Sequence, residues 1–163
     1  MAVLAVRLWP DPVLSRMAGP VTDLAAAREL AADMLDTMYH AQGRGLAAPQ
    51  VGVSLRLFVM DATWKEGAPT PQVFMNPVIV SRSGDVATGP EGCLSIPGIT
   101  ISIARATAIR LRWTDLDGVM QDADLTGFQA ICAQHEIDHL DGIVTLDRLS
   151  PEARALAEAE YLA

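Results

Sequence analysis

The sequence is poor in aromatic residues, in cysteine and in basic residues. Aromatic residues make up 5% of its 163 residues, and 12 Lys and Arg face 20 Asp and Glu, which gives a formal net charge of −8. Because phosphate binding needs clustered cations, this balance argues against tight nucleic-acid binding. Its two cysteines, Cys93 and Cys132, are too far apart in the chain for a disulfide framework and favour a reducing compartment.

The sequence also has no recognisable targeting segment. Its first residues lack a basic segment followed by a long apolar one, so we predict no signal peptide. No run of about 18 apolar residues occurs, and we therefore predict no membrane association through a transmembrane helix. With 50% hydrophobic residues and no linker or repeat, residues 1–163 should form a single domain in the cytoplasm.

Hydrophobic spacing predicts three helices. Apolar residues recur at helical spacing over 23–41, and a second helix is expected over 126–141, with Gly142 just past its end. Ser150-Pro151 has the cap-then-proline pattern that starts a third, short helix.

Apolar runs and strict alternation predict strands between these helices. The expected strands are 55–60, 73–80, 85–88, 99–103 and 109–113, with a hairpin turn at Asp117-Gly118. The segment 89–98 is bounded by Gly and Pro, so we expect a loop there. Strands do not alternate with crossover helices, which predicts an α+β fold with antiparallel or mixed β-sheets packed around the helix at 126–141.

The strongest chemical signal is His135-Glu136-Ile137-Asp138-His139 on the predicted second helix. Residues four apart lie on one helix face, so His135 and His139 can bind one metal ion, and Glu136 can act on a water beside it. The alternative is a pair of histidines that are merely hydrogen-bonded in a core or on a surface.

A catalytic site of this kind needs a third protein ligand, and several residues are candidates. A further histidine six residues after the second is excluded, because Thr145 stands there. Glu158 and Glu160 are available, but the intervening chain is short. Cys132 precedes His135 by three residues, although a free cysteine is more often a small buried hydrophobe. Cys93 lies in the expected loop and is the better candidate.

A third motif is Gly43-Arg44-Gly45-Leu46-Ala47-Ala48-Pro49-Gln50. Its glycines allow positive φ or a close backbone approach, and Gln50 offers an amide donor. A Gly-rich helix end followed by a core strand would explain the same pattern.

Together these three segments resemble the peptide deformylase family. That family is recognised by Gly-x-Gly-Leu-Ala-Ala-x-Gln, then Glu-Gly-Cys-Leu-Ser, then Gln-His-Glu-x-Asp-His-Leu. The chain has these motifs at 43–50, 91–95 and 134–140, in that order, so the resemblance spans nearly the whole chain as one catalytic domain.

The resemblance implies a metal-dependent hydrolase that removes the formyl group from the N-terminal formyl-methionine of new polypeptides and releases formate. It implies that Cys93, His135 and His139 hold one divalent metal ion, natively Fe²⁺, for which Zn²⁺, Ni²⁺ or Co²⁺ can substitute. The alternatives are a related enzyme with another acyl or peptide specificity, and a metal- or peptide-binding protein with little turnover.

The resemblance also implies the catalytic roles. Glu136 would be the general base, and the Gln50 side-chain amide and the Leu94 backbone N–H would stabilise the oxyanion. Glu91 and Arg105 match positions that support the cysteine segment, which predicts a partly buried ion pair between them.

Substrate binding is implied for one further group of residues. The backbone of Gly45 would pair with the peptide like an added strand, and the pocket would involve Arg44, Gly89, Phe128, Ile131 and Cys132. For Phe128, Ile131 and Cys132, ordinary core packing is the alternative.

Four residues depart from the family's usual pattern and leave the substrate preference open. Arg44 stands where an apolar residue is usual, and Gly89 is smaller than usual. Pro90 replaces a polar residue, and Thr100 replaces a basic one. The predicted C-terminal helix carries Glu152, Glu158 and Glu160 with only Arg154, so we expect no basic docking tail and at most transient ribosome contact.

Overall fold

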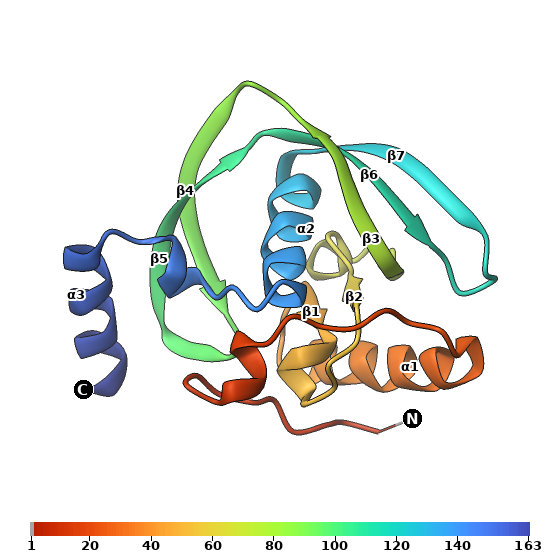
Figure 1. Cartoon of the computed structure of the whole chain (residues 1–163), viewed down its shortest axis with the longest axis horizontal. Coiled ribbons are helices and arrows are strands. Elements are labelled where there is room, and N and C mark those ends of the chain that lie inside the picture. Colours follow the sequence, from red (N-terminus) through yellow and green to blue (C-terminus); the bar gives the residue numbers. More distant parts are fainter. Residues whose placement is uncertain (1) are drawn as a thin grey trace.

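Two antiparallel β-sheets enclose a central helix in this computed structural model, which describes residues 2–163 (Figure 1). The helices are α1 (Leu24–His40), α2 (Gly127–Leu140) and α3 (Pro151–Leu162). The strands are β1 (Gly45–Ala47), β2 (Leu57–Met60), β3 (Gln72–Arg82), β4 (Val86–Cys93), β5 (Ile96–Ala106), β6 (Ala108–Thr114) and β7 (Met120–Thr126). One sheet has the order β1-β2-β3-β6-β7, and β4 and β5 form the other. The predicted α+β class is confirmed.

Helix α1 covers the outer face of the five-stranded sheet. Asp23 caps it by accepting a hydrogen bond from the backbone N–H of Ala26, as the sequence predicted. Side chains of β2 point alternately to opposite faces, so Leu57 and Val59 pack against α1, while Phe58 packs in the core beneath α2. Both faces of β2 are therefore buried, and its sequence is apolar throughout.

Helix α2 lies between the two sheets and is buried on nearly all sides (Figure 1). It starts at Gly127 and ends before Gly142, which has a φ of 75° that a glycine adopts without strain. Gln134, His135, Glu136, Asp138 and His139 are all less than 9% exposed. Buried polar groups are costly unless they are paired or bind a ligand, so this helix must carry a polar site.

The segment 89–98 is not the loop that the sequence predicted. Strand β4 continues to Cys93, β5 begins at Ile96, and only Leu94 and Ser95 lie between them. Strand β4 pairs with β5 alone, and a strand with one partner tolerates proline and glycine, which misled the prediction. The short strand expected at 85–88 is the start of β4. Cys93 therefore lies at a strand end and not in a long loop.

Strand β7 was not predicted, because its two aspartates disfavour strand structure in isolation. In the fold, Asp122 lies opposite Arg112 and Asp124 lies opposite Arg110 on β6. Arg110 forms ion pairs with both aspartates, so cross-strand charge pairing stabilises this edge strand. The predicted turn at Asp117-Gly118 joins the two strands.

The C-terminal helix begins as predicted, with the Ser150 hydroxyl accepting a hydrogen bond from the backbone N–H of Ala153. Helix α3 packs beside β5, and the Tyr161 hydroxyl donates to the Trp9 carbonyl at 3.0 Å, which joins the two ends of the chain. Within residues 2–163, no helix combines the length and apolar character needed to cross a membrane.

Candidate metal centre

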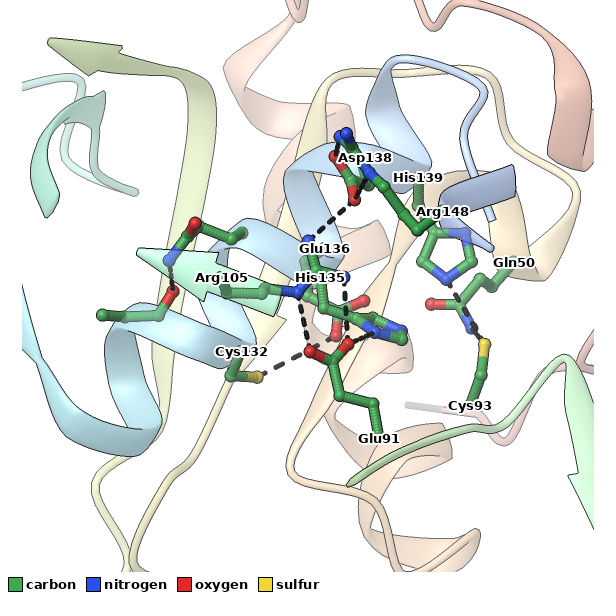
Figure 2. Close-up of polar contacts among 12 residues, drawn as sticks. Gln50, Glu91, Cys93, Arg105, Cys132, His135, Glu136, Asp138, His139 and Arg148 are labelled. Atoms are coloured by element: carbon green, nitrogen blue, oxygen red, sulfur yellow. Dashed lines mark hydrogen bonds and ion pairs between the residues drawn. The ribbon is translucent and has the colours of Figure 1, made fainter. Parts of the chain in front are cut away.

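The two histidines of the central motif lie on one face of α2, and a cysteine faces them from the end of β4 (Figure 2). The Cys93 Sγ lies 3.4 Å from the Nε2 of His139. One ligand atom from each of Cys93, His135 and His139 lies within 4.8 Å of the other two. The fold thus brings together the three residues that the sequence analysis put forward as ligands.

This donor set fits a divalent transition metal. A thiolate and two imidazoles suit Fe²⁺ or Zn²⁺ and leave a fourth position for water or substrate. Burial alone would lower the pKa of His135, but Glu136, Cys93 and Glu91 raise it well above its usual range. The surroundings of His135 therefore favour a positive charge, which a metal cation supplies.

Cys132 is not part of this cluster. Its Sγ lies 3.9 Å from Oε2 of Glu136 and 4.0 Å from the backbone carbonyl of Arg44. Burial, with a further contribution from Glu136, raises the pKa of the Cys132 thiol well above its usual value. Cys132 is therefore an uncharged thiol beside the general-base candidate.

Glu136 is 3% exposed, and its Oε1 has no hydrogen-bond partner in the described part of the chain. A buried carboxylate oxygen without a protein partner marks a position where a water or a substrate atom would be held. Burial raises the pKa of Glu136 to about 7. A carboxyl group with this pKa can both accept and return a proton near neutral pH.

Gln50 is fixed beside the cysteine by both ends of its amide. Its Oε1 accepts from the backbone N–H of Ala47 at 2.9 Å, and its Nε2 lies 3.1 Å from the Ser95 hydroxyl and 3.8 Å from the Cys93 Sγ. Leu94 follows Cys93 in the turn, and its backbone N–H has no acceptor among residues 2–163. Two donors therefore lie next to Cys93.

A buried charge network holds the ligand-bearing elements together (Figure 2). Arg105 on β5 donates to both carboxylate oxygens of Glu91, at 2.7 and 2.9 Å, which confirms the predicted ion pair. Glu91 in turn lies 2.9 Å from Nδ1 of His135. A carboxylate at this nitrogen orients the ring so that Nε2 can face the metal.

The same arginine extends the network to the other side of α2. Arg105 donates to Asp138 at 2.8 Å, and Arg148 donates to both oxygens of Asp138. The sequence analysis assigned no role to Asp138, Arg148 or Ser95. The position of Asp138 inside the motif was the one available signal, because a charged residue on a buried helix requires a partner.

A cavity of about 660 Å³ opens beside the centre. Its lining contains every residue put forward for substrate binding, namely Arg44, Gly45, Gly89, Phe128, Ile131 and Cys132. Pro90 also lines the cavity, whereas Thr100 does not.

Gly45 makes the close backbone approach that the sequence analysis allowed for the glycines of this motif. A Cβ at this position would lie 2.5 Å from Oε2 of Glu136 and 2.6 Å from the Sγ of Cys132. A methyl group at this position would therefore have to displace the Glu136 carboxylate and the Cys132 thiol.

A model of the polypeptide deformylase family matches residues 3–155. The chain belongs to this family. It is 51% identical over 151 residues to the peptide deformylase of Alkalilimnicola ehrlichii. The aligned region covers 92% of this chain and 84% of that protein. The peptide deformylase structure from Legionella pneumophila has a TM-score of 0.92 at 40% identity, and covers 98% of this chain and 94% of that one.

A further solved structure of the family shares the same fold. The peptide deformylase from Synechococcus elongatus in complex with actinonin has a TM-score of 0.91 at 36% identity, and the match covers 96% of this chain and 86% of that one. Deformylases are metal-dependent hydrolases, so the family membership confirms the resemblance and the predicted enzyme class.

Proposed function

We propose that this protein hydrolyses the formyl group from the N-terminal formyl-methionine of new polypeptides, releasing formate and a free α-amine. The observation that carries the proposal is the convergence of Cys93, His135 and His139 beside the unpartnered carboxylate oxygen of Glu136. Both features lie at one cavity in a member of the deformylase family.

We propose Fe²⁺ as the native metal, with Zn²⁺, Ni²⁺ and Co²⁺ as functional substitutes. Cys93, His135 and His139 would hold the ion, and the mixed sulfur and nitrogen donor set supports this assignment. When bound, the ion would supply a Lewis acid, which can polarise a carbonyl group and lower the pKa of water.

Glu136 would act as the general base and then as the general acid. Its free Oε1 would take a proton from the attacking water, and the same carboxyl group would deliver that proton to the leaving amine. The glutamate is held in a buried position beside Gly45, the residue of β1 along which the peptide would run.

Gln50 and Leu94 would stabilise the negative charge that develops on the formyl oxygen. The carbonyl end of the Gln50 amide is held by the Ala47 backbone N–H, so its NH₂ group points toward Ser95 and Cys93 without rearrangement. The Leu94 backbone N–H provides a second donor beside Cys93. Donors that are oriented before the reaction stabilise an oxyanion most effectively.

The peptide would bind along the free edge of β1. Strand β1 pairs only with β2, so its other edge can add a substrate strand through backbone hydrogen bonds at Gly45. Phe128, Ile131 and Cys132 line the cavity from α2 and would surround the methionine side chain. Arg44 and Gly89 would lie at the same cavity and shape the substrate preference.

We propose that the protein acts in the cytoplasm with at most transient ribosome contact. Helix α3 supports this, because its one arginine, Arg154, is already paired with Asp147 and Glu158. The net charge of −8 supports the same view, since docking to RNA requires clustered cations.

Formate release from formyl-Met-Ala tests the proposal. Protein purified without oxygen and loaded with Fe²⁺ is expected to release formate, and the variant Glu136→Gln is expected to lose turnover while it retains one metal ion per chain. Glu152→Gln, on the exposed face of α3, is the matched control and should match the unmodified protein. No formate from fully loaded protein would contradict the proposed activity, and an active Glu136→Gln variant would contradict the role of the base.

A further inference from the structure

Two cations line the cavity of an otherwise acidic protein. Arg44 is half-buried and Lys65 is exposed, and both belong to the lining of the cavity that holds the proposed active site. Within residues 2–163, neither forms an ion pair, whereas most other arginines do. The paired arginines are Arg7, Arg56, Arg105, Arg110, Arg112, Arg148 and Arg154.

Arg44 is held in place without using its hydrogen-bond donors. Its guanidinium carbon lies 3.8 Å from the centre of the Phe128 ring, a distance typical of a cation–π contact. Within the described residues the Arg44 side chain makes no hydrogen bond or ion pair, so its N–H groups remain available. Those N–H groups match a carboxylate in a two-pronged arrangement.

Lys65 belongs to a segment that is anchored next to Arg44. Asp61 is fully buried and accepts hydrogen bonds from the Tyr39 hydroxyl at 2.5 Å and from two backbone N–H groups of the same segment. The Trp64 ring N–H donates to the Gly43 carbonyl at 2.9 Å, and the Lys65 Nζ lies 5.7 Å from the centre of the Trp64 ring. The segment that carries Lys65 is therefore tied to the residue that precedes Arg44.

The carboxylates that line the cavity do not neutralise these cations. They are Glu91, which is bound to Arg105, and Glu136, which lies deep beside the metal-ligating residues. Among residues 2–163, therefore, the two cavity cations Arg44 and Lys65 have no anionic partner. Arg44 directly precedes Gly45, so a peptide bound along β1 would pass close to it.

We propose that Arg44 and Lys65 form a cationic rim that selects formylated peptides with an Asp or Glu side chain within the three residues after the formyl-methionine. This selectivity rests on the proposed deformylase function. An extended peptide advances about 3.3 Å per residue, so these three side chains lie within about 10 Å of the methionine. Pairs between partly exposed groups are weak, and we expect the two cations together to raise kcat/KM roughly threefold to tenfold.

Matched peptides isolate the effect of the side-chain charge. Formyl-Met peptides with an amidated C-terminus would carry Asp or Asn at the second, third or fourth position, because Asn has the same shape without the charge. The readout is the ratio of kcat/KM for each Asp peptide to that for its Asn partner. We expect this ratio to be about three or more for at least one of the three peptide positions. At high salt the ratio should fall toward a value of about 1, because salt screens exposed charges.

Variants test which residues produce the ratio. Arg44→Met/Lys65→Met should bring the ratio close to one, and Arg44→Glu should favour a Lys peptide over the Asp peptide. Lys65→Met alone removes an exposed side chain and keeps the test informative if changes at Arg44 impair folding. Arg82→Met is the matched control, because Arg82 is an exposed arginine at the end of β3 and outside the cavity lining. This control should keep the ratio of the unmodified protein.

The possible outcomes distinguish a failure of the proposed cationic rim from a failure of the proposed deformylase activity. Formate released equally fast from Asp and Asn peptides would overturn the rim and leave the deformylase function standing. A ratio that persists in the double variant, or that Arg82→Met abolishes, would also overturn it. No formate from any peptide would overturn the deformylase function and, with it, the selectivity that depends on it.

Discussion

Arg105 is a buried residue whose removal should strongly destabilise the fold. Its side chain is 5% exposed and makes three charged hydrogen bonds, two to Glu91 and one to Asp138. In Arg105→Met the aliphatic part of the side chain is kept, while both carboxylates lose a cation. Glu91 would retain only His135, and Asp138 would retain only Arg148.

The expected cost follows from this burial. Removing one partner of a buried ion pair costs about 3–5 kcal/mol, because an uncompensated charge is left behind. For a domain of this size, 1 kcal/mol corresponds to about 2–4 °C in Tm, so Arg105→Met should lower Tm by roughly 6–20 °C. Glu91 also orients the ring of His135, and we therefore expect weaker metal binding in the same variant.

Urea unfolding followed by circular dichroism measures the free energy of unfolding directly. Arg112→Met is the matched control, because the Arg112 side chain is 48% exposed and its pair with Asp122 should contribute about 0–1 kcal/mol. Both variants should be measured with saturating metal and with chelator, since bound metal adds to apparent stability. A loss for Arg105→Met no larger than that for Arg112→Met would refute the reasoning.

Two further predictions concern single contacts. Gly45→Ala should lower kcat/KM at least about tenfold, because the new methyl group would displace the Glu136 carboxylate. Gly84→Ala is the control and should leave kcat/KM unchanged, because a methyl group there meets no atom within 4 Å. Equal kcat/KM values for the two variants would exclude the steric role of Gly45. Burial alone would raise the pKa of Asp61, but hydrogen bonds from Tyr39 and from backbone N–H groups lower it. Asp61 therefore stabilises the fold above its unfolded pKa of about 4, and this contribution is lost as the pH falls through the lower folded value. The Tm advantage of the unmodified protein over Asp61→Asn should shrink between pH 5 and pH 2, and an advantage that does not change with pH would contradict this assignment.

The helices were predicted well because their signals are local. Asp23 and Ser150 cap the helices that follow them, and Gly142 follows the end of α2. The residues that determine each of these helix ends therefore lie within a few positions of it in the sequence. Strand β5 was predicted for a similar reason, since its isoleucines alternate with other residues, which indicates a strand with one buried face. Strand β7 and the second half of β4 were missed, because their stability comes from partners elsewhere in the chain, and their own residues disfavour strands.

The metal centre shows the same division between local and tertiary signals. His135 and His139 follow from helix periodicity alone. For the third ligand the residues left several candidates, among which Cys93 was the better one, and the resemblance to a family then implied the same residue. No periodicity relates Cys93 to α2, because the two meet only when the hairpin of β4 and β5 packs against that helix. Asp138 is the clearest case of a missed role: it lies between the two histidines in sequence, yet its partners come from β5 and from a turn ten residues further on. The motif therefore carries both the proposed histidine ligands and one anchor of the helix that presents them, and the anchoring role emerges only from the tertiary contacts.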